Sequence, residues 1–391
     1  MEPIAMVGLG VVLFALINSC SSSNTRRRRQ KQSIEKDLED LAENLSPSEK
    51  YIQAGQQAAN SVFTLLQENA DMLGLSIART KIAGSVGKNT GISFIDMQKE
   101  QLVNPDFDCV LFVNDEEPPF RYLMRDIGNL LEKHPCIRNV TTKSRFSIQF
   151  YYFSDSKDEQ YSYAIPFDLL PATNYVKGLD LVSLRGQSVG ELEARIVQKN
   201  IREQQKRSIA AENDVNEQKN RMYSSCLAEM TVDCIRDYVK VDRTLKVVRL
   251  AKFWNYHLDM DGEYVSARSC IIEIIAIHAH LKRVKKRDLV ASFYEFLEAM
   301  RDFSKLEISL NNQSINPVFD NELPLIIDPA NELNNLARGI SKRAVNVFET
   351  QAKMTLNYLN ELRKTGVYEG CEDDVERIFL HKQGDTYPIY K

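Results

Sequence analysis

The sequence predicts an α+β fold in which a β-rich lobe precedes a helical lobe. Three stretches rich in aromatic and β-branched residues, which are typical of strands, read FDCVLFVND, RFSIQFYYF and YSYAIPFDLL. From Cys226 to Leu359, nearly every segment instead repeats its apolar residues with a helical period. Strands first and helices after are typical of α+β proteins rather than of alternating βαβ units.

Composition limits the class of protein. The chain has 391 residues, which allows two or three domains. It carries 50 Lys and Arg against 54 Asp and Glu, a net charge of −4, and 43% of its residues are hydrophobic. This balance excludes a wholly disordered chain, a collagen-like repeat and a protein with several membrane spans. It also argues against a protein that coats nucleic acid non-specifically, because such binding requires an excess of basic residues.

The N-terminal segment has the composition of a membrane anchor. Residues 3–19 are predominantly apolar, and the arginines Arg26 to Arg29 follow them. Since positive charges stay on the cytosolic side, we expect a short uncleaved anchor in the endoplasmic reticulum or the mitochondrial outer membrane, with the body in the cytosol. A cleaved secretory signal is the competing interpretation, although the acidic Glu2 stands where such signals carry positive charge.

Changes in composition predict four parts of the chain. They are a membrane anchor (1–25), a charged tether or solvated helix (26–47), a β-rich lobe (48–225) with a charged helical insertion near 191–223, and a helical lobe (226–391). Apolar spacing predicts helices from Tyr51 to Met72 and from Asp126 to Lys133. His278 and His280 lie in an apolar run, which favours partnered imidazoles in a buried helix over a metal site.

Two aspartates at the start of FDCVLFVND form the first candidate site. Side chains two residues apart on a strand point to the same face, so the carboxylates of Asp106 and Asp108 project together. A third, Asp168, follows the apolar run YAIPF and is placed to reach the same point from a neighbouring strand. Mg²⁺ prefers carboxylate oxygens, and three carboxylates can hold two ions for a phosphoryl displacement. Taken alone, the pattern also fits a surface turn.

A glycine-rich turn, GSVGKNT, precedes these aspartates. Its glycines, beginning at Gly84, allow backbone amides to approach an anion, and Ser85 and Lys88 add a hydroxyl and a positive charge. The spacing differs from that of a Walker loop. An ordinary turn without a ligand is the alternative interpretation.

The order of these motifs resembles that of template-independent nucleotidyltransferases of the polymerase-beta-like superfamily. Four further stretches resemble the 2′-5′-oligoadenylate synthetases: TLKVVRLAKFWNYHL, IIEIIAIHAH, PFDLLPA and PLIIDPANELNNL. The similarity extends from about Lys81 to Leu359. It implies a polymerase-beta-like nucleotidyltransferase lobe with a mixed β-sheet, followed by a helical lobe.

The resemblance implies an activity and its metal ligands. Asp106, Asp108 and Asp168 would bind Mg²⁺ or Mn²⁺, and Asp168 would also accept the proton of the attacking hydroxyl. ATP would be joined to the 2′-hydroxyl of an acceptor with release of pyrophosphate. The implied product is a 2′-5′-linked oligoadenylate, or a related oligonucleotide, made in innate antiviral immunity.

The resemblance also implies nucleotide-binding residues in both lobes. In the loop that begins at Gly84, Ser85 would bind the terminal phosphates of ATP, and Lys88 stands where the family has a basic residue. In the helical lobe, Arg249 and Lys252 match a basic pair that contacts the acceptor and donor nucleotides. Lys246, Arg249 and Lys252 step by three along one helix, which also fits a solvated basic stripe.

Double-stranded RNA activates most members of that branch, so it is a candidate partner of this chain. Such RNA is recognised through its shape and its 2′-hydroxyl groups along a basic face of the protein. The candidates for this face are Arg79, Lys81 and the Lys and Arg residues between Arg195 and Arg221.

Two departures from the family leave a second function open. A longer linker, ISFIDMQKEQLVNP, separates the glycine-rich turn from the aspartates, and Ser269-Cys270 replaces the Gln-Tyr pair that stacks on the donor base. The alternative is a catalytically inactive, nucleotide-binding adaptor anchored on an organelle membrane. The anchor favours the adaptor. The three aspartates favour the enzyme, because a binding module has no need of mutually repelling carboxylates.

Overall fold

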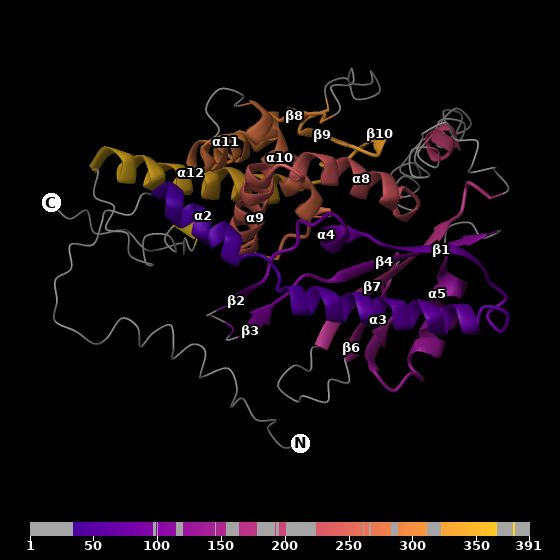
Figure 1. Cartoon of the computed structure of the whole chain (residues 1–391). Helices are drawn as coiled ribbons and strands as arrows, with labels where there is room; N and C mark the ends of the chain where they lie inside the picture. Colours follow the sequence, from indigo (N-terminus) through magenta and orange to yellow (C-terminus); the bar gives the residue numbers. More distant parts are fainter. Residues whose placement is uncertain are drawn as a thin grey trace, which may run out of the picture.

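The two predicted lobes are present in the computed structural model (Figure 1). It describes residues 34–96, 99, 101–114, 120–144, 146–153, 164–177, 192, 195–200, 224–260, 262–265, 267–282, 288–310, 322–365 and 378–379. The predicted fold class, an α+β protein with a mixed sheet followed by helices, is confirmed. The insertion expected near 191–223 lies mostly outside the described residues.

A mixed five-stranded sheet forms the first lobe. In order across the sheet, its strands are β1 (Ser76–Ile82), β4 (Phe107–Asn114), β7 (Ala164–Thr173), β6 (Ile148–Phe153) and β5 (Ile137–Thr141). The central strands β4 and β7 are parallel, whereas the other neighbours are antiparallel. A two-stranded hairpin lies apart from this sheet and consists of β2 (Phe94–Asp96) and β3 (Gln101–Val103).

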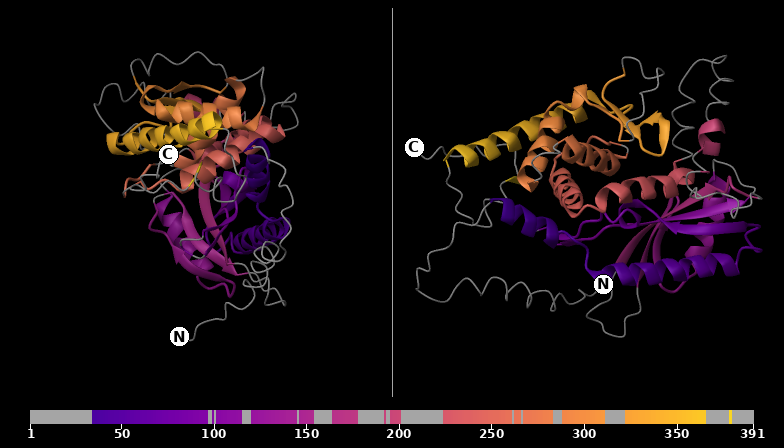
Figure 2. Two further views of the ribbon diagram at one scale, coloured as in Figure 1. Left: turned by 90° about the vertical axis from the view of Figure 1, so that its left-hand side faces the viewer. Right: turned by 45° about the horizontal axis from the view of Figure 1, so that its top comes forward.

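The two faces of the sheet are packed differently. One face is covered by α3 (Glu49–Glu68) and α5 (Arg121–Leu131), whose apolar side chains share a core with alternate residues of the strands (Figure 2). On the opposite face, Val110 and Phe112 of β4 and Ala172 of β7 are buried against residues 226–232. Along β6, Gln149, Tyr151 and Phe153 project from this face and are exposed. Among the described residues, the helical lobe therefore covers only part of this face.

The helical lobe is built around α10 (Arg268–Lys282), which is apolar on nearly all sides. Around it lie the helices α8 (Ala228–Val239), α9 (Asp242–Tyr256), α11 (Leu289–Arg301) and α12 (Lys342–Thr365), the short helices η3 (Ser225–Leu227) and η4 (Phe303–Lys305), and the small strands β8 (Glu307–Ile308), β9 (Leu325–Asp328) and β10 (Asn331–Asn335). A helix surrounded by apolar side chains must be buried within a lobe. As predicted, His280 of this helix is buried and partnered, with its Nδ1 3.0 Å from the hydroxyl of Ser292.

The segment predicted as a turn has more structure than expected. The strand β1 ends at Ile82, two residues before Gly84, and a short helix, α4 (Gly84–Gly87), forms the first part of the segment. β1 alternates little between buried and exposed positions, so its sequence lacks the alternation of apolar and polar residues that predicts a strand. The two predicted helices correspond to α3 and α5.

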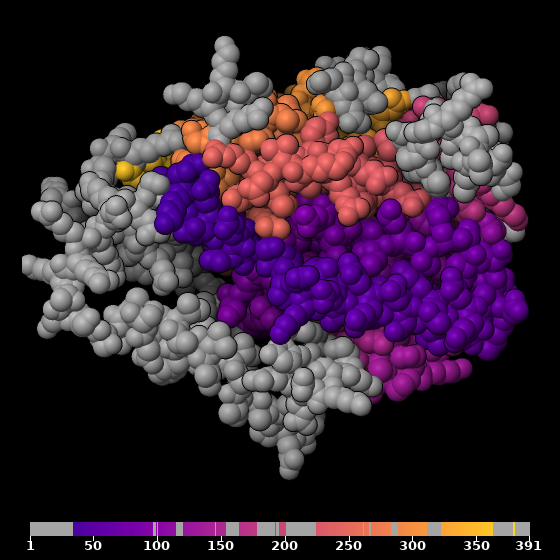
Figure 3. All heavy atoms as spheres, viewed as in Figure 1, coloured from indigo at the N-terminus to yellow at the C-terminus, as the bar shows by residue number. Residues whose placement is uncertain are grey.

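The described part of the predicted tether is a packed helix, α2 (Ile34–Asn44). Leu38, Ala42 and Leu45 follow a spacing of four and then three residues, and all three are buried in the core of the helical lobe. The charged residues around them dominate the composition and obscured this apolar stripe. Figure 3 shows the N-terminal segment of α2 and α3, in indigo, running from the helical lobe to the sheet lobe.

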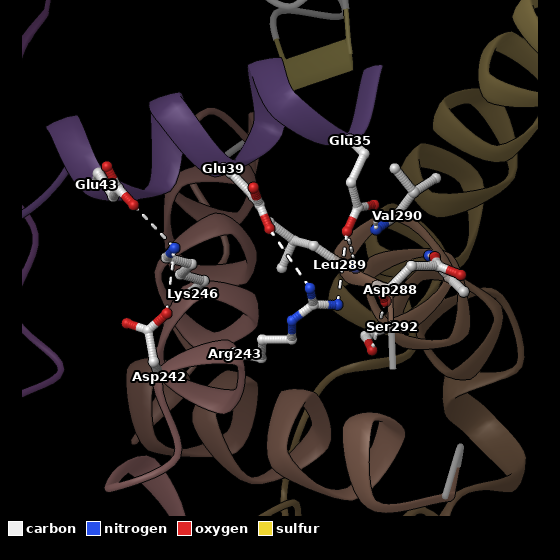
Figure 4. A network of polar contacts seen from close by, with 11 residues as sticks. Glu35, Glu39, Glu43, Asp242, Arg243, Lys246, Asp288, Leu289, Val290 and Ser292 are labelled. Atoms are coloured by element: carbon white, nitrogen blue, oxygen red, sulfur yellow. Dashed lines mark hydrogen bonds and ion pairs between the residues drawn. The ribbon is translucent and has the colours of Figure 1, made fainter. Parts of the chain in front are cut away.

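Charged contacts also hold α2 on the helical lobe (Figure 4). Glu35 accepts hydrogen bonds from the backbone N–H groups of Leu289, at 2.6 Å, and Val290, at 2.9 Å. These groups open α11, where a helix has unsatisfied donors and a positive dipole end. Glu43 pairs with Lys246 of α9 at 2.9 Å. The acidic residues of α2 thus position the helix on α9 and α11.

The prediction of a membrane-anchored localisation is corrected. Within the described ranges, no helix is both long and apolar enough to cross a bilayer. Even α12, with 24 residues, carries charged side chains along its whole length, and each would be costly in hydrocarbon. Residues 3–19, on which the prediction was based, lie outside the described residues.

We predict that Leu38→Ala destabilises the protein by about 2–5 kcal/mol, because the truncation leaves a cavity between α2 and the helical core. Urea unfolding of the full chain measures the change. Asp40→Ala, an exposed position on the same helix, serves as the control and should change stability by less than about 0.5 kcal/mol. Equal stability of both variants would show that α2 is a dispensable tether.

Candidate active site

Parallel pairing of β4 and β7 brings two of the predicted aspartates together. The register aligns Asp108 with Asp168, so the two carboxylates lie on adjacent strands and project from the same face of the sheet. Phe107 and Phe167, one residue earlier on each strand, are buried in the core on the opposite face. Asp106 directly precedes β4 and is exposed.

Asp106 is positioned by the residue before it. The phenol of Tyr51, which is buried on α3, donates a 2.8 Å hydrogen bond to the backbone carbonyl of Pro105. The ring of Tyr51 also contacts Phe107, with ring centroids 5.9 Å apart. A helix on the core face therefore holds the chain on both sides of Asp106.

The glycine-rich loop approaches Asp108 closely. Gly84 has a φ of +56°, and a Cβ atom at this position would lie 1.6 Å from Oδ2 of Asp108. The backbone N–H of Ala83 donates to the carbonyl of Asp108 at 2.7 Å. Only glycine satisfies both the conformation and the close approach. Ser85 follows in α4, half-buried.

The carboxylates repel one another. Burial, together with the negative charges of Asp168 and Asp106, raises the pKa of Asp108 to about 7. Burial also raises the pKa of Asp168, although a hydrogen bond from Gln149, its cross-strand neighbour on β6, partly offsets this shift. An added cation near these groups would favour their charged forms.

The donor set fits a hard divalent cation such as Mg²⁺, because all three side chains are carboxylates that destabilise one another when charged. Among the residues described, however, no three acidic, histidine or cysteine side chains converge tightly enough to hold a metal ion. The chemistry of the site therefore matches the predicted cation, while the side-chain positions are not those of a closed coordination shell.

A buried carboxylate, which the sequence analysis did not single out, connects the two lobes beside the aspartates. Glu273 of α10 is 0% exposed and forms ion pairs with Lys88 of the loop and, at 3.0 Å, with Lys252 of α9. The hydroxyl of Thr90 donates to the same carboxylate at 2.6 Å. Two of the predicted nucleotide-binding lysines are thus held side by side by one glutamate.

The charges of this cluster do not balance. Burial alone would raise the pKa of Glu273, but the ammonium groups of Lys88 and Lys252 lower it to about 2. Burial lowers the pKa of Lys252, and its attraction to Glu273, which Lys88 shares, only partly offsets that effect. Two cations and one anion leave a positive charge next to Asp108.

The other predicted basic residues have different surroundings. Arg249 is buried and its Nε has no hydrogen-bond partner in the described part of the chain; there, no hydrogen bond or ion pair joins it to the loop or to the aspartates. Lys246 pairs with α2. The three-residue step along α9 therefore distributes these charges over different neighbours, and only Lys252 joins the Glu273 cluster.

The predicted RNA-binding residues on β1 face an internal partner. Arg79 donates to Glu229 of α8 at 2.8 Å and to Asn174 at 2.8 Å, and its guanidinium lies 3.8 Å from the centre of the Phe112 ring. Lys81 is 3.8 Å from the same glutamate. Both cations therefore help to connect the sheet to the helical lobe.

Glu273 could have been found from the sequence. It is the only acidic residue in the stretch IIEIIAIHAH, and an ionised side chain in such a helix requires a partner. Gln149 gave no comparable signal, because its position opposite Asp168 depends on strand register.

We predict that Glu273→Gln lowers stability by about 3–5 kcal/mol near neutral pH, because it leaves two buried ammonium groups without a counter-charge. The pKa of Glu273 is depressed in the folded protein, so its stabilisation is present above the unfolded pKa, near 4.5, and is lost as the pH falls toward about 2. The difference between wild type and variant should therefore shrink over that range.

Urea unfolding across this pH range measures the effect. Glu68→Gln, at an exposed position that ends α3, is the matched control and should have little effect at any pH. A Glu273→Gln variant as stable as wild type near pH 7 would refute the conclusion that Glu273 is the counter-charge of Lys88 and Lys252.

Comparison with known proteins supports the fold. No family model and no curated protein matches the chain. Among solved structures, it is similar to CdnC of E. coli MS115-1 in complex with HORMA-deltaN, with 16% identity, a TM-score of 0.58 and coverage of 88% of this chain and 96% of that one. CdnC with ATP has 17% identity and a TM-score of 0.54, with coverage of 89% and 98%.

A mutant of the Cid1 poly(U) polymerase bound to MgATP is similar as well. It has 11% identity and a TM-score of 0.56, with coverage of 90% of this chain and 100% of that one. Both neighbours are nucleotidyltransferases of the polymerase-beta-like superfamily. At these identities the likeness concerns the fold alone. The chain has the fold of the polymerase-beta-like nucleotidyltransferases.

Proposed function

We propose that the protein is a metal-dependent nucleotidyltransferase that joins a nucleoside triphosphate to the hydroxyl of a nucleotide acceptor. The observation that carries this proposal is the register of β4 and β7, which aligns Asp108 with Asp168 beside a loop whose Gly84 touches Asp108. Carboxylates that repel one another lie next to two lysines that share a single counter-charge. This arrangement suits a site that binds both cations and phosphates. Neither group alone explains the arrangement.

Each group has a distinct part in the proposed reaction. Asp106, Asp108 and Asp168 would hold Mg²⁺, which when bound neutralises charge on the phosphates. The acceptor oxygen forms a bond to the α-phosphorus. The bond between the α-phosphorus and the oxygen that bridges it to the β-phosphorus breaks, and pyrophosphate leaves. Asp168 accepts the hydroxyl proton, and burial, which raises its pKa, makes it a better base.

The donor phosphates are assigned to the loop and to α9. The hydroxyl of Ser85 would donate to the terminal phosphates, and the positive charge shared by Lys88 and Lys252 would offset their negative charge. Because Glu273 fixes both lysines before the donor binds, little ordering of these side chains remains to be done.

ATP is the proposed donor, and a 2′-5′-linked oligoadenylate or a related oligonucleotide is the proposed product. Both assignments are based on the motifs that resemble oligoadenylate synthetases. The neighbouring structures that contain ATP or MgATP support only the choice of donor. Activation by double-stranded RNA stays a prediction that is based on the resemblance alone. The two candidate residues on β1, Arg79 and Lys81, both pair with Glu229.

We predict that the full chain, given ATP and Mg²⁺, releases pyrophosphate and forms oligonucleotides, and that Asp106→Asn with Asp108→Asn lowers this rate by at least about a thousandfold. Nuclease digestion of the product identifies its linkage. Asp71→Asn, at an exposed position after α3, is the control and should keep full activity.

A second readout separates catalysis from binding. Mg²⁺ should raise the melting temperature of the wild type but not that of the double variant, because a ligand stabilises only the state that binds it. Product from the double variant would refute the proposal. Nucleotide binding without any product would instead indicate a binding protein that does not catalyse transfer.

A further inference from the structure

The part of the sheet face that the helical lobe leaves uncovered carries two exposed aromatic rings. Along β6, Ile148 and Phe150 are buried in the core, whereas Tyr151 is 42% exposed and Phe153 is 40% exposed. Alternation on a strand places these two rings on the same face as Gln149. Large aromatic side chains that remain exposed to water do so at a cost in free energy.

Strand register places the rings beside the proposed catalytic centre. Gln149 is opposite Asp168 and hydrogen bonds to it. Tyr151 and Phe153 follow on the same face, opposite residues that precede Asp168 on β7. A continuous row thus runs from the carboxylate to the two rings.

A positive charge flanks this row. Arg138 of β5 is the cross-strand partner of Tyr151 and is exposed. The preceding residue, Ile137, is buried in the core, so Arg138 projects from the face that carries the rings. Aromatic rings with an adjacent guanidinium are the groups that stack bases and neutralise phosphates in single-stranded nucleic acid sites.

We propose that Tyr151, Phe153 and Arg138 form an acceptor subsite that binds the bases of a single-stranded oligonucleotide whose terminal hydroxyl lies at Asp168. This inference rests on the proposed function. Side chains two residues apart on a strand are separated by about 6.6 Å, roughly twice the stacking distance of bases, which fits one base between the rings. Aromatic side chains on an open sheet bind single strands in this manner. A duplex would not satisfy them, because its bases are already stacked.

The test measures binding by the full chain without any reaction. A fluorescein-labelled single-stranded oligoadenylate about ten nucleotides long is titrated in the absence of metal and ATP, and its anisotropy is followed. Each of Tyr151→Ala and Phe153→Ala should weaken binding roughly 5- to 150-fold, as expected for the loss of one stacked base. Tyr122→Ala removes a ring that is 75% exposed on α5, over the opposite face, and should bind as the wild type does.

A conservative variant tests stacking directly. The chain has one tryptophan, Trp254, which is 1% exposed, so Phe153→Trp adds a solvent-exposed reporter. The oligonucleotide should bind this variant with near wild-type affinity and quench the new emission, whereas a blunt duplex of the same sequence should not. Unquenched emission, or stronger quenching by the duplex, would overturn the stacking role.

Failure of this inference is distinguishable from failure of the proposed function. Unchanged oligonucleotide binding in both alanine variants, or no binding by the wild type, would overturn the subsite even if nucleotidyl transfer occurs. Weakened binding in these variants supports the subsite even if the chain forms no product. In an active enzyme, we further expect the alanine variants to raise the KM for the oligonucleotide acceptor and to leave that for ATP unchanged.

Discussion

The buried carboxylate of Glu273 is the constraint on which the arrangement of the two lobes depends. An ionised group that is fully removed from water requires partners within reach. Here, the partners come from the glycine-rich loop of the first lobe and from α9 of the second. The lobes cannot separate at this point without exposing the cluster or leaving charges unpaired in the interior. One glutamate therefore fixes the position of the loop relative to α9 and α10.

This arrangement also determines the electrostatics of the site. Lys88 and Lys252 share one counter-charge, while the aspartates a strand away carry an excess of negative charge whose repulsion contributes to the raised pKa of Asp108. The lysines offset this repulsion only in part: the pKa of Asp108 stays raised although the charges of Lys88 and Lys252 lower it. A ligand that brings both anionic oxygens and a cation would relieve both imbalances. A nucleoside triphosphate with its divalent ion has this composition.

Motifs in the sequence were enough to predict the fold class and to place Asp168 on a strand near the D-x-D pair. D-x-D opens a strand, and the apolar run YAIPF, which Asp168 follows, identifies a second strand. The structure adds the parallel pairing that aligns Asp108 with Asp168. The glycine-rich turn was also recognisable, although the prediction was that its amides approach an anion, whereas the structure shows Gly84 packed against Asp108.

Long-range partners were not predictable in the same way. The three-residue spacing of Lys246, Arg249 and Lys252 suggested a shared helix face. In the structure, Lys246 pairs with Glu43 of α2, whereas Lys252 pairs with Glu273. α2 itself was hard to recognise among its charged residues, because a helix that buries only Leu38 and Ala42 differs little in composition from a solvated linker. Such contacts depend on which surfaces meet, and a single sequence records that only indirectly.

The uneven cover of the sheet explains why the candidate site lies where it does. β4 and β7 are buried on both faces around Phe112 and Ala172, whereas on the neighbouring strand β6 the described residues Gln149, Tyr151 and Phe153 are exposed on the same face as the aspartates. Asp108 and Asp168 lie at the boundary between these two regions. Burial on one side raises the pKa of both carboxyl groups, and the other side is where a substrate would enter. Toward the helical lobe lie Lys88 and Lys252, the proposed partners of the donor phosphates. Toward the free side, the rings of Tyr151 and Phe153 offer stacking surface. Two nucleotides approaching from opposite sides would therefore meet at the carboxylates, which is the geometry that joining a donor to an acceptor requires.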